Sequence, residues 1–204
     1  MSTYARFPIV LTKGSGAFVS DIDGKKYLDF VSGIAVNAFG HADTKQALAI
    51  SMQAKSLLHV SNLYYNVPQI MLAEWLTDHS FADRVFFCNS GAEANEGAIK
   101  LARRFAKTID PNRFEIITAE GSFHGRTLAA LAATGQEKYH KGFEPLPGGF
   151  KYVPFNDAAA LEKEIGPNTD AILLEPIQGE GGVRTPHPDY LAQVRALCDR
   201  HRLL

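Results

Sequence analysis

The sequence predicts an α/β protein built around a mostly parallel sheet with helices on both faces. From residue 84 onward, short apolar segments alternate with segments of helical composition, as parallel strands joined by helices do. Turns that contain glycine and polar residues follow three of these apolar segments directly. Residues 11–30 differ, because extended runs flank a turn, and they predict a small N-terminal α+β segment that contains a hairpin.

Local signals predict the N-terminal elements. Residues 17–20 and 25–30 are the extended runs of the hairpin, and residues 21–24 supply its turn. The composition of residues 42–58 predicts a helix. A second helix is predicted to begin near Pro68, because proline suits the first turn of a helix.

The elements of the parallel sheet follow. The predicted strands are residues 85–87, 114–118, 150–153 at an edge, and 171–174, and the predicted helices are residues 91–107, 158–165 and 188–201. Residues 127–134 fit either a helix or a strand. Because ligands bind beyond the carboxyl ends of the strands in open α/β sheets, we expect the turns after the strands to converge on one edge.

Composition and charge limit the classes of protein to which this chain can belong. A chain of 204 residues with 46% hydrophobic and 21% charged residues can bury a substantial core. It has no apolar run of 18 residues and no secretory signal, so we expect a cytoplasmic protein without membrane contact. The formal charge of -1 and the scattered basic residues argue against a nucleic-acid partner. Cys88 and Cys198 are predicted to be reduced, and Cys198 with His201 lacks the second pair of a metal site.

The clearest functional signal lies at the start of the helix predicted after residue 90. Ser90 is a favourable N-cap and Glu93 completes a capping box, so the helix should begin at Gly91 or Ala92. Its first turn has little side-chain bulk, and its exposed amides carry the positive end of the helix dipole. Ser90, Gly91 and Ala92 therefore predict a phosphate seat, although a capped core helix without a ligand has the same pattern. The residues predicted to face the sheet are Ala94, Ala98, Leu101, Ala102 and Phe105.

Three motifs in this order resemble the class III aminotransferases of the ornithine and acetylornithine type: residues 85–104, 120–127 and 174–182. Further matching runs extend the resemblance over nearly the whole chain. It implies the fold type I transferase architecture, pyridoxal phosphate as cofactor and a homodimer with its active site at the subunit interface. It also implies that residues 1–40 belong to the small domain and residues 41–204 to the amino-terminal half of the large cofactor-binding domain.

The resemblance implies roles for residues near the phosphate seat. Phe123 is expected to cover the cofactor ring, since an aromatic face packs well against a flat heterocycle, and Glu175 is expected to lie close to the cofactor. Arg126 is expected to hold the substrate carboxylate, because its planar guanidinium binds both oxygens at once. Glu180 is expected to pair with a switch arginine from a later part of the family sequence. His124 is assigned no catalytic role.

Ordinary structural interpretations stand beside these roles. Taken alone, Phe123 would be a core phenylalanine, Arg126 a surface arginine and Glu180 a solvated loop glutamate. A carboxylate that is buried without a partner costs several kcal/mol. Glu175 and Glu180 are therefore predicted to have cationic or hydrogen-bonding partners.

Two N-terminal residues bear on the substrate. Tyr4 resembles a tyrosine that reaches the substrate carboxylate in acetylornithine members of the family. Ile34 stands where ornithine δ-aminotransferases carry tyrosine, whose hydroxyl could recognise a free α-amino group. The resemblance thus implies amino-group transfer between N-acetylornithine, or a related ω-amino acid, and the 2-oxo acid 2-oxoglutarate, in arginine biosynthesis. An ornithine or 4-aminobutyrate aminotransferase is the alternative within the family.

Transamination needs a lysine that forms a Schiff base with the cofactor. In the family, this lysine lies beyond the part that residues 1–204 match. The aspartate opposite the ring nitrogen of the cofactor also lies beyond that part. The lysines considered as substitutes, Lys100, Lys138, Lys141 and Lys151, are predicted to be surface charges. We therefore expect the amino-terminal half of an aminotransferase that is inactive by itself. The competing hypothesis is a non-catalytic module that binds the cofactor, a phosphate or another subunit. A dinucleotide-binding oxidoreductase is disfavoured, because no G-x-G-x-x-G follows a predicted strand.

Overall fold

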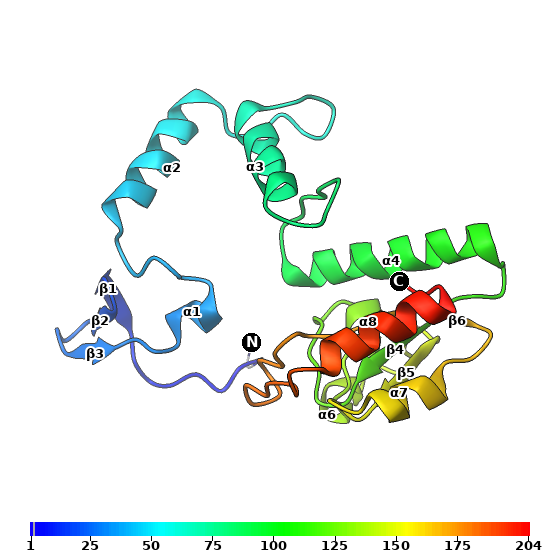
Figure 1. Ribbon diagram of the computed structural model, residues 1–204. Helices are drawn as coiled ribbons and strands as arrows, with labels where there is room; N and C mark the ends of the chain where they lie inside the picture. The colour runs from blue at the N-terminus through cyan, green and yellow to red at the C-terminus, as the bar shows by residue number, and fades with distance from the viewer. Residues whose placement is uncertain (2) are drawn as a thin grey trace. The chain divides into compact units, whose positions relative to one another are not determined.

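The structure is a computed structural model that describes residues 1 and 3–204 (Figure 1). The chain divides into two compact units, Met1–Val85 and Phe86–Leu204. The domain boundary predicted after residue 40 falls inside the first unit and stays a prediction. Among the described helices, none combines the length and the apolar character that a membrane span requires.

The first unit begins with a three-stranded antiparallel sheet, β1 (Leu11–Ser15), β2 (Phe18–Asp21) and β3 (Lys26–Leu28), in the order β1-β2-β3. The predicted hairpin is confirmed as the β2–β3 pair, whose turn is held by backbone amides that donate to the Asp21 carboxylate. The prediction was incomplete, because β1 adds a third strand beside β2. The short helix α1 (Ser32–Ala35) is an irregular turn with positive φ at Gly33 and Ile34.

Two capped helices complete this unit. α2 (Thr44–Ser56) begins after Asp43, whose carboxylate accepts a hydrogen bond from the Gln46 amide at 2.7 Å. α3 (Val67–Asp78) begins after Asn66 and has Pro68 in its first turn. Both predicted helices are confirmed, because the N-cap side chains satisfy amides that a helix cannot satisfy internally.

The second unit contains a parallel sheet of β4 (Glu115–Ala119), β5 (Phe150–Val153) and β6 (Thr169–Leu173), in the order β5-β4-β6. Three of the four predicted strands are confirmed to within about two residues. The strand predicted at residues 85–87 is wrong, since these residues belong to no strand. Within residues 1 and 3–204, no strand pairs with this apolar run, and a strand is defined by such a partner.

Helices cover both faces of this sheet, as predicted (Figure 1). They are α4 (Gly91–Ile109), α5 (Leu128–Ala133), α6 (Glu137–His140), α7 (Ala158–Glu164) and α8 (Tyr190–His201). One buried cluster joins α7 and α8 to β4 through Ile117, Leu161 and Leu197. The other joins α4 and α5 to the sheet through Ile116 and Ala133. The alternating pattern of strands and helices therefore gives a core on each side of the sheet.

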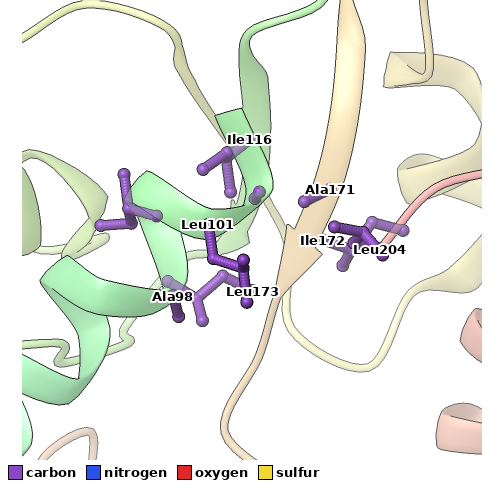
Figure 2. A pocket seen from close by; sticks show the side chains of 9 residues that line it. Ala98, Leu101, Ile116, Ala171, Ile172, Leu173 and Leu204 are labelled. Carbon is purple, nitrogen blue, oxygen red and sulfur yellow. The ribbon is translucent and has the colours of Figure 1, made fainter. Parts of the chain in front are cut away.

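The buried face of α4 differs from the predicted one. Ile99, Ala102 and Ala106 are buried, whereas Leu101 is 67% exposed. Together with Ala98, Leu101 lines an open apolar cavity of about 290 Å³ that β6 and Leu204 complete (Figure 2). The prediction is confirmed for Ala102 and wrong for Ala94, Ala98, Leu101 and Phe105, which are exposed, because the side of α4 that packs on the sheet runs through Ile99, Ala102 and Ala106.

Candidate functional site

The start of α4 has the predicted capped geometry. The Ser90 hydroxyl accepts a hydrogen bond from the Glu93 amide at 3.2 Å, and the helix begins at Gly91. The Glu93 carboxylate in turn accepts from the Asn89 amide at 2.7 Å. The expected start is thus confirmed, with the carboxylate of the capping box directed to Asn89 rather than to Ser90.

Two amides at this helix start are free. Within the described part of the chain, the backbone N–H groups of Gly91 and Ala92 have no hydrogen-bond acceptor. A side-chain carbon placed on Gly91 would meet no atom within 4 Å, so there is open space beside this residue. Amides at the positive end of a 19-residue helix, with room for a ligand, are suited to bind an anion.

The segment after β4 lies against this helix start. Gly125 has a φ of +136°, and a Cβ atom added to it would lie 2.8 Å from the Cβ of Ala92. Asn95 of α4 donates to the backbone carbonyl of His124 at 2.7 Å. These contacts bring the first two motifs together, and glycine is required at position 125 because any side chain would separate them.

The segment after β6 is joined to the one after β4. The two carboxylate oxygens of Glu175 accept hydrogen bonds from the amides of Phe123, at 2.8 Å, and Gly179, at 3.1 Å. Buried Gln178 donates to the carbonyl of Glu120 at 2.9 Å. The predicted convergence of the three motifs is therefore confirmed. The need of Glu175 for a partner is met by backbone amides.

Aromatic and charged side chains gather beside these joined segments. The guanidinium carbon of Arg126 lies 5.8 Å from the ring centre of Phe123 and 4.5 Å from that of Tyr139. The Tyr139 hydroxyl donates to the Glu180 carboxylate at 2.6 Å. Arg126 and Glu180 are exposed, whereas Phe123 is half-buried. The site thus offers a ring surface, a cation and a carboxylate close to one another.

His124 lies beneath this surface. Its side chain is buried, and within residues 1 and 3–204 its Nε2 has no hydrogen-bond partner. Burial lowers the pKa of His124, and the charge of Glu175 opposes this effect only in part. Burial therefore favours the neutral form of the imidazole.

Tyr4 and Ile34 belong to the first unit. Both side chains are largely exposed, and Arg6 stacks on the ring of Tyr4 with its guanidinium carbon 6.0 Å from the ring centre. Ile34 has a φ of +63°, a region that is costly for a β-branched side chain. Their roles at the substrate stay predictions.

The lysines have the surface placement that was expected. Lys100, Lys138 and Lys141 are exposed. Lys151 is half-buried and forms an ion pair of 3.0 Å with Glu115. Lys100 lies within the first motif, at an exposed position of α4, and the other three lysines lie outside the three converging motifs.

Fold and site together define an α/β protein in which, among the described residues, two amides without acceptors at a helix start lie next to an aromatic surface and an arginine without an ion pair. The model of the family "Aminotransferase class-III" matches residues 2–204, and the chain belongs to this family. Acetylornithine aminotransferase of Caldanaerobacter subterraneus subsp. tengcongensis is 56% identical over 100% of this chain and 52% of that protein. The chain spans about half the length of the curated relatives it matches.

Solved structures of aminotransferases have the same fold as this chain. N-acetylornithine aminotransferase from Stenotrophomonas maltophilia matches with a TM-score of 0.83 and 42% identity, over 100% of this chain and 51% of that one. Ornithine aminotransferase from Toxoplasma gondii, in a structure with partial occupancy of PLP at its active site, matches with a TM-score of 0.93 and 35% identity, over 100% of this chain and 49% of that one. The fold type I transferase architecture is thereby confirmed.

Sequence reasoning missed four polar residues that hold the site together: Asn95, Glu96, Tyr139 and Gln178. Each joins segments that are distant in sequence, as the Asn95–His124 and Tyr139–Glu180 hydrogen bonds do. For Gln178, a polar residue between apolar and glycine-rich runs was the available signal. For the others, local sequence gives no signal, because their partners are defined by tertiary contacts.

Proposed function

We propose that residues 1–204 form the cofactor-binding half of a pyridoxal-phosphate-dependent aminotransferase that acts on N-acetylornithine and 2-oxoglutarate. The observation that carries the proposal is the pair of amides at Gly91 and Ala92 that have no acceptor within the described residues, with open space beside Gly91. Family membership and relatives named acetylornithine aminotransferase support the same conclusion.

The residues of the site fit pyridoxal phosphate. Ser90, Gly91 and Ala92 would hold the phosphate group by the positive end of α4. Phe123 would cover the ring, and Glu175 would keep Phe123 in place through the hydrogen bond to its amide. When bound, the cofactor supplies the electron sink that amino-group transfer requires.

Charged residues of the chain would orient the substrates. Arg126 has its planar donors available and is suited to bind a carboxylate of the amino acid or 2-oxo acid in a bidentate manner. Glu180 places a negative charge in the same region, held by the Tyr139 hydroxyl. Ile34, in place of tyrosine, removes a hydroxyl that would favour a free α-amino group. The substrate assignment to N-acetylornithine draws support from this residue and from the relatives' names.

Subunit and cellular context are part of the proposal. We expect a cytoplasmic homodimer, in which residues 59–65 supply part of the contact between subunits. Leu63, Tyr64 and Tyr65 of this segment are exposed, as an interface segment requires. Small-molecule amino acids and 2-oxo acids are the expected partners.

The phosphate seat can be tested with Gly91→Asp and its uncharged counterpart Gly91→Asn. Open space around Gly91 accommodates either side chain, and an aspartate in the first turn favours the helix. The dissociation constant of pyridoxal phosphate, measured by calorimetry, should rise at least tenfold more in the Asp variant, because a carboxylate repels the phosphate. Binding of phosphate-free pyridoxal should respond equally to both substitutions. Equal affinities of both variants and the wild type for pyridoxal phosphate contradict the proposal.

The inactivity of residues 1–204 by themselves can be tested by borohydride reduction in the presence of pyridoxal phosphate. We expect no stoichiometric pyridoxyl group on any single lysine, because the four candidate lysines are exposed or paired with Glu115. Mass spectrometry of a tryptic digest reads out the result. One fully modified lysine would overturn this expectation, and reading the gene past codon 204 provides an independent check of whether a lysine follows in frame.

A further inference from the structure

Tyr139 contacts three side chains of the candidate site. Its hydroxyl donates a hydrogen bond of 2.6 Å to Glu180. The guanidinium carbon of Arg126 lies 4.5 Å from its ring centre, and its ring meets that of Phe123 edge to face, with 5.7 Å between the ring centres. A single residue of α6 thus joins the ring surface, the cation and the carboxylate.

The ring of Tyr139 holds Arg126 without using its donors. Within the described residues, the Arg126 guanidinium forms no hydrogen bond and no ion pair to protein. Stacking on an aromatic face fixes the plane of the guanidinium and leaves its N–H groups free. A free, oriented guanidinium is the arrangement that binds a carboxylate at two oxygens.

The hydroxyl of Tyr139 acts on Glu180. This carboxylate is exposed and sits on a loop with glycine at positions 179, 181 and 182, so its side chain is free to move unless it is held. An unheld carboxylate would pair with the unpaired Arg126, because both contact the same tyrosine. Such a pair would compete with a substrate carboxylate for the same donors.

We propose that Tyr139 is a positioning residue for substrate binding: its ring holds Arg126 ready for a carboxylate, and its hydroxyl keeps Glu180 from occupying Arg126. The inference rests on the proposed function, since that function makes Arg126 the carboxylate-binding residue. The inference predicts that removing the ring of Tyr139 and removing its hydroxyl have separate, measurable effects on the binding of a carboxylate.

Glutarate, a dicarboxylate that cannot react, probes both effects. Its dissociation constant is measured by calorimetry, with and without pyridoxal phosphate, in the longest in-frame polypeptide that contains this sequence. Tyr139→Phe keeps the ring, and we expect it to weaken glutarate binding by about threefold to tenfold, the range that corresponds to the net contribution of one ordinary hydrogen bond. Adding Glu180→Gln should restore binding to within about twofold, because an amide does not compete for Arg126 as a charge does. Tyr139→Leu should weaken binding further, and Glu180→Gln should not restore it.

A merely structural role of Tyr139 would not produce this rescue. Thermal unfolding of the Tyr139→Phe variant serves as the folding control and should match that of the wild type. Three outcomes would overturn the inference. The glutarate affinity of Tyr139→Phe could equal that of the wild type, Glu180→Gln could fail to restore the affinity that Tyr139→Phe loses, or the wild type could bind no glutarate. If the wild type binds glutarate with this pattern but not pyridoxal phosphate, the proposed function fails and the role of Tyr139 stands.

Discussion

At the scale of single residues, Asp170 combines burial with an ionisable group. It lies in β6 with 3% of its surface exposed, and within residues 1 and 3–204 neither carboxylate oxygen has a hydrogen-bond partner. Burial raises the pKa of Asp170 from 3.8 to about 6, although the positive charge of Arg103 acts in the opposite direction. Because the folded state holds the proton more tightly than the unfolded state, ionisation of Asp170 destabilises the fold.

Asp170→Asn should therefore stabilise the second unit in a pH-dependent manner. The destabilisation caused by ionised Asp170 grows as the pH rises from 3.8 to about 6. It has reached its full size once the pH is well above 6. Near pH 8 we expect the variant to gain about 2 to 3 kcal/mol of unfolding free energy, and near pH 4 little. Urea unfolding at both pH values measures this, with the exposed Asp199→Asn as the control. An equal gain at the two pH values would show that the charge is not the cause.

Gly125 is the residue whose lack of a side chain matters most at the site. An added Cβ would lie 2.8 Å from Ala92 and 3.0 Å from Ala130, and the φ of +136° disfavours any other residue. Gly125→Ala should cost about 1 to 3 kcal/mol of unfolding free energy and weaken pyridoxal phosphate binding, because the start of α4 must shift. Gly97→Ala, in the interior of α4 where the nearest atom is 3.4 Å away, is the matched control and should be neutral or stabilising. Chemical denaturation that gives equal values for the two variants contradicts this prediction.

At the scale of elements, α5 depends on α4 for its N-terminal cap. The Glu96 carboxylate of α4 accepts hydrogen bonds from the Thr127 hydroxyl at 2.6 Å and from the amides of Ala129 and Ala130 at 3.1 and 3.2 Å. Thr127 itself provides no side-chain cap to the helix. The negative charge of Glu96 is therefore placed at the positive end of α5, where it is favourable.

Glu96→Ala should uncap α5. We expect a loss of about 1.5 to 3 kcal/mol, typical of hydrogen bonds to a charged group, and faster amide hydrogen exchange in residues 128–133. Hydrogen-exchange mass spectrometry resolves this local effect. Glu162→Ala, which removes only an exposed ion pair with Arg200, is the control and should cost less than about 1 kcal/mol. Unaltered exchange in α5 would contradict the capping role.

At the scale of the whole molecule, many large apolar side chains are exposed. They include Leu101, which lines the open apolar cavity beside β6 (Figure 2), and Tyr65, which is 93% exposed. Exposed apolar area of this kind favours association with other surfaces. The two units each contain many such residues, so poor solubility of residues 1–204 by themselves is expected.

Leu101→Glu should reduce this tendency. A charged side chain at the cavity lowers the affinity for apolar dyes and raises solubility, because it cannot be buried without a partner. Binding of anilinonaphthalene sulfonate and sedimentation velocity measure the two effects. Lys100→Glu, on the neighbouring exposed position of α4, should leave dye binding at the wild-type level. If Leu101→Glu and Lys100→Glu bind the dye equally well, the apolar surface that binds the dye does not include Leu101.

The sequence by itself determined the features that depend on near neighbours in the chain. The cap of α4 is formed within four residues, so Ser90 predicted the start of this helix correctly, and Pro68 predicted the start of α3 to within one residue. Continuous apolar runs predicted three parallel strands, and the motifs that follow β4 and β6 meet as predicted. The family followed from the same motifs.

Tertiary structure decided what depends on partners distant in sequence. Residues 85–87 have strand composition but lack a neighbouring strand in the described chain, and a strand is stable only with one. Tyr139 reaches Glu180 across 41 residues, and Asn95 reaches His124 across 29. Such pairs form because the sheet brings their segments to one edge, and no local pattern specifies which polar side chains then meet.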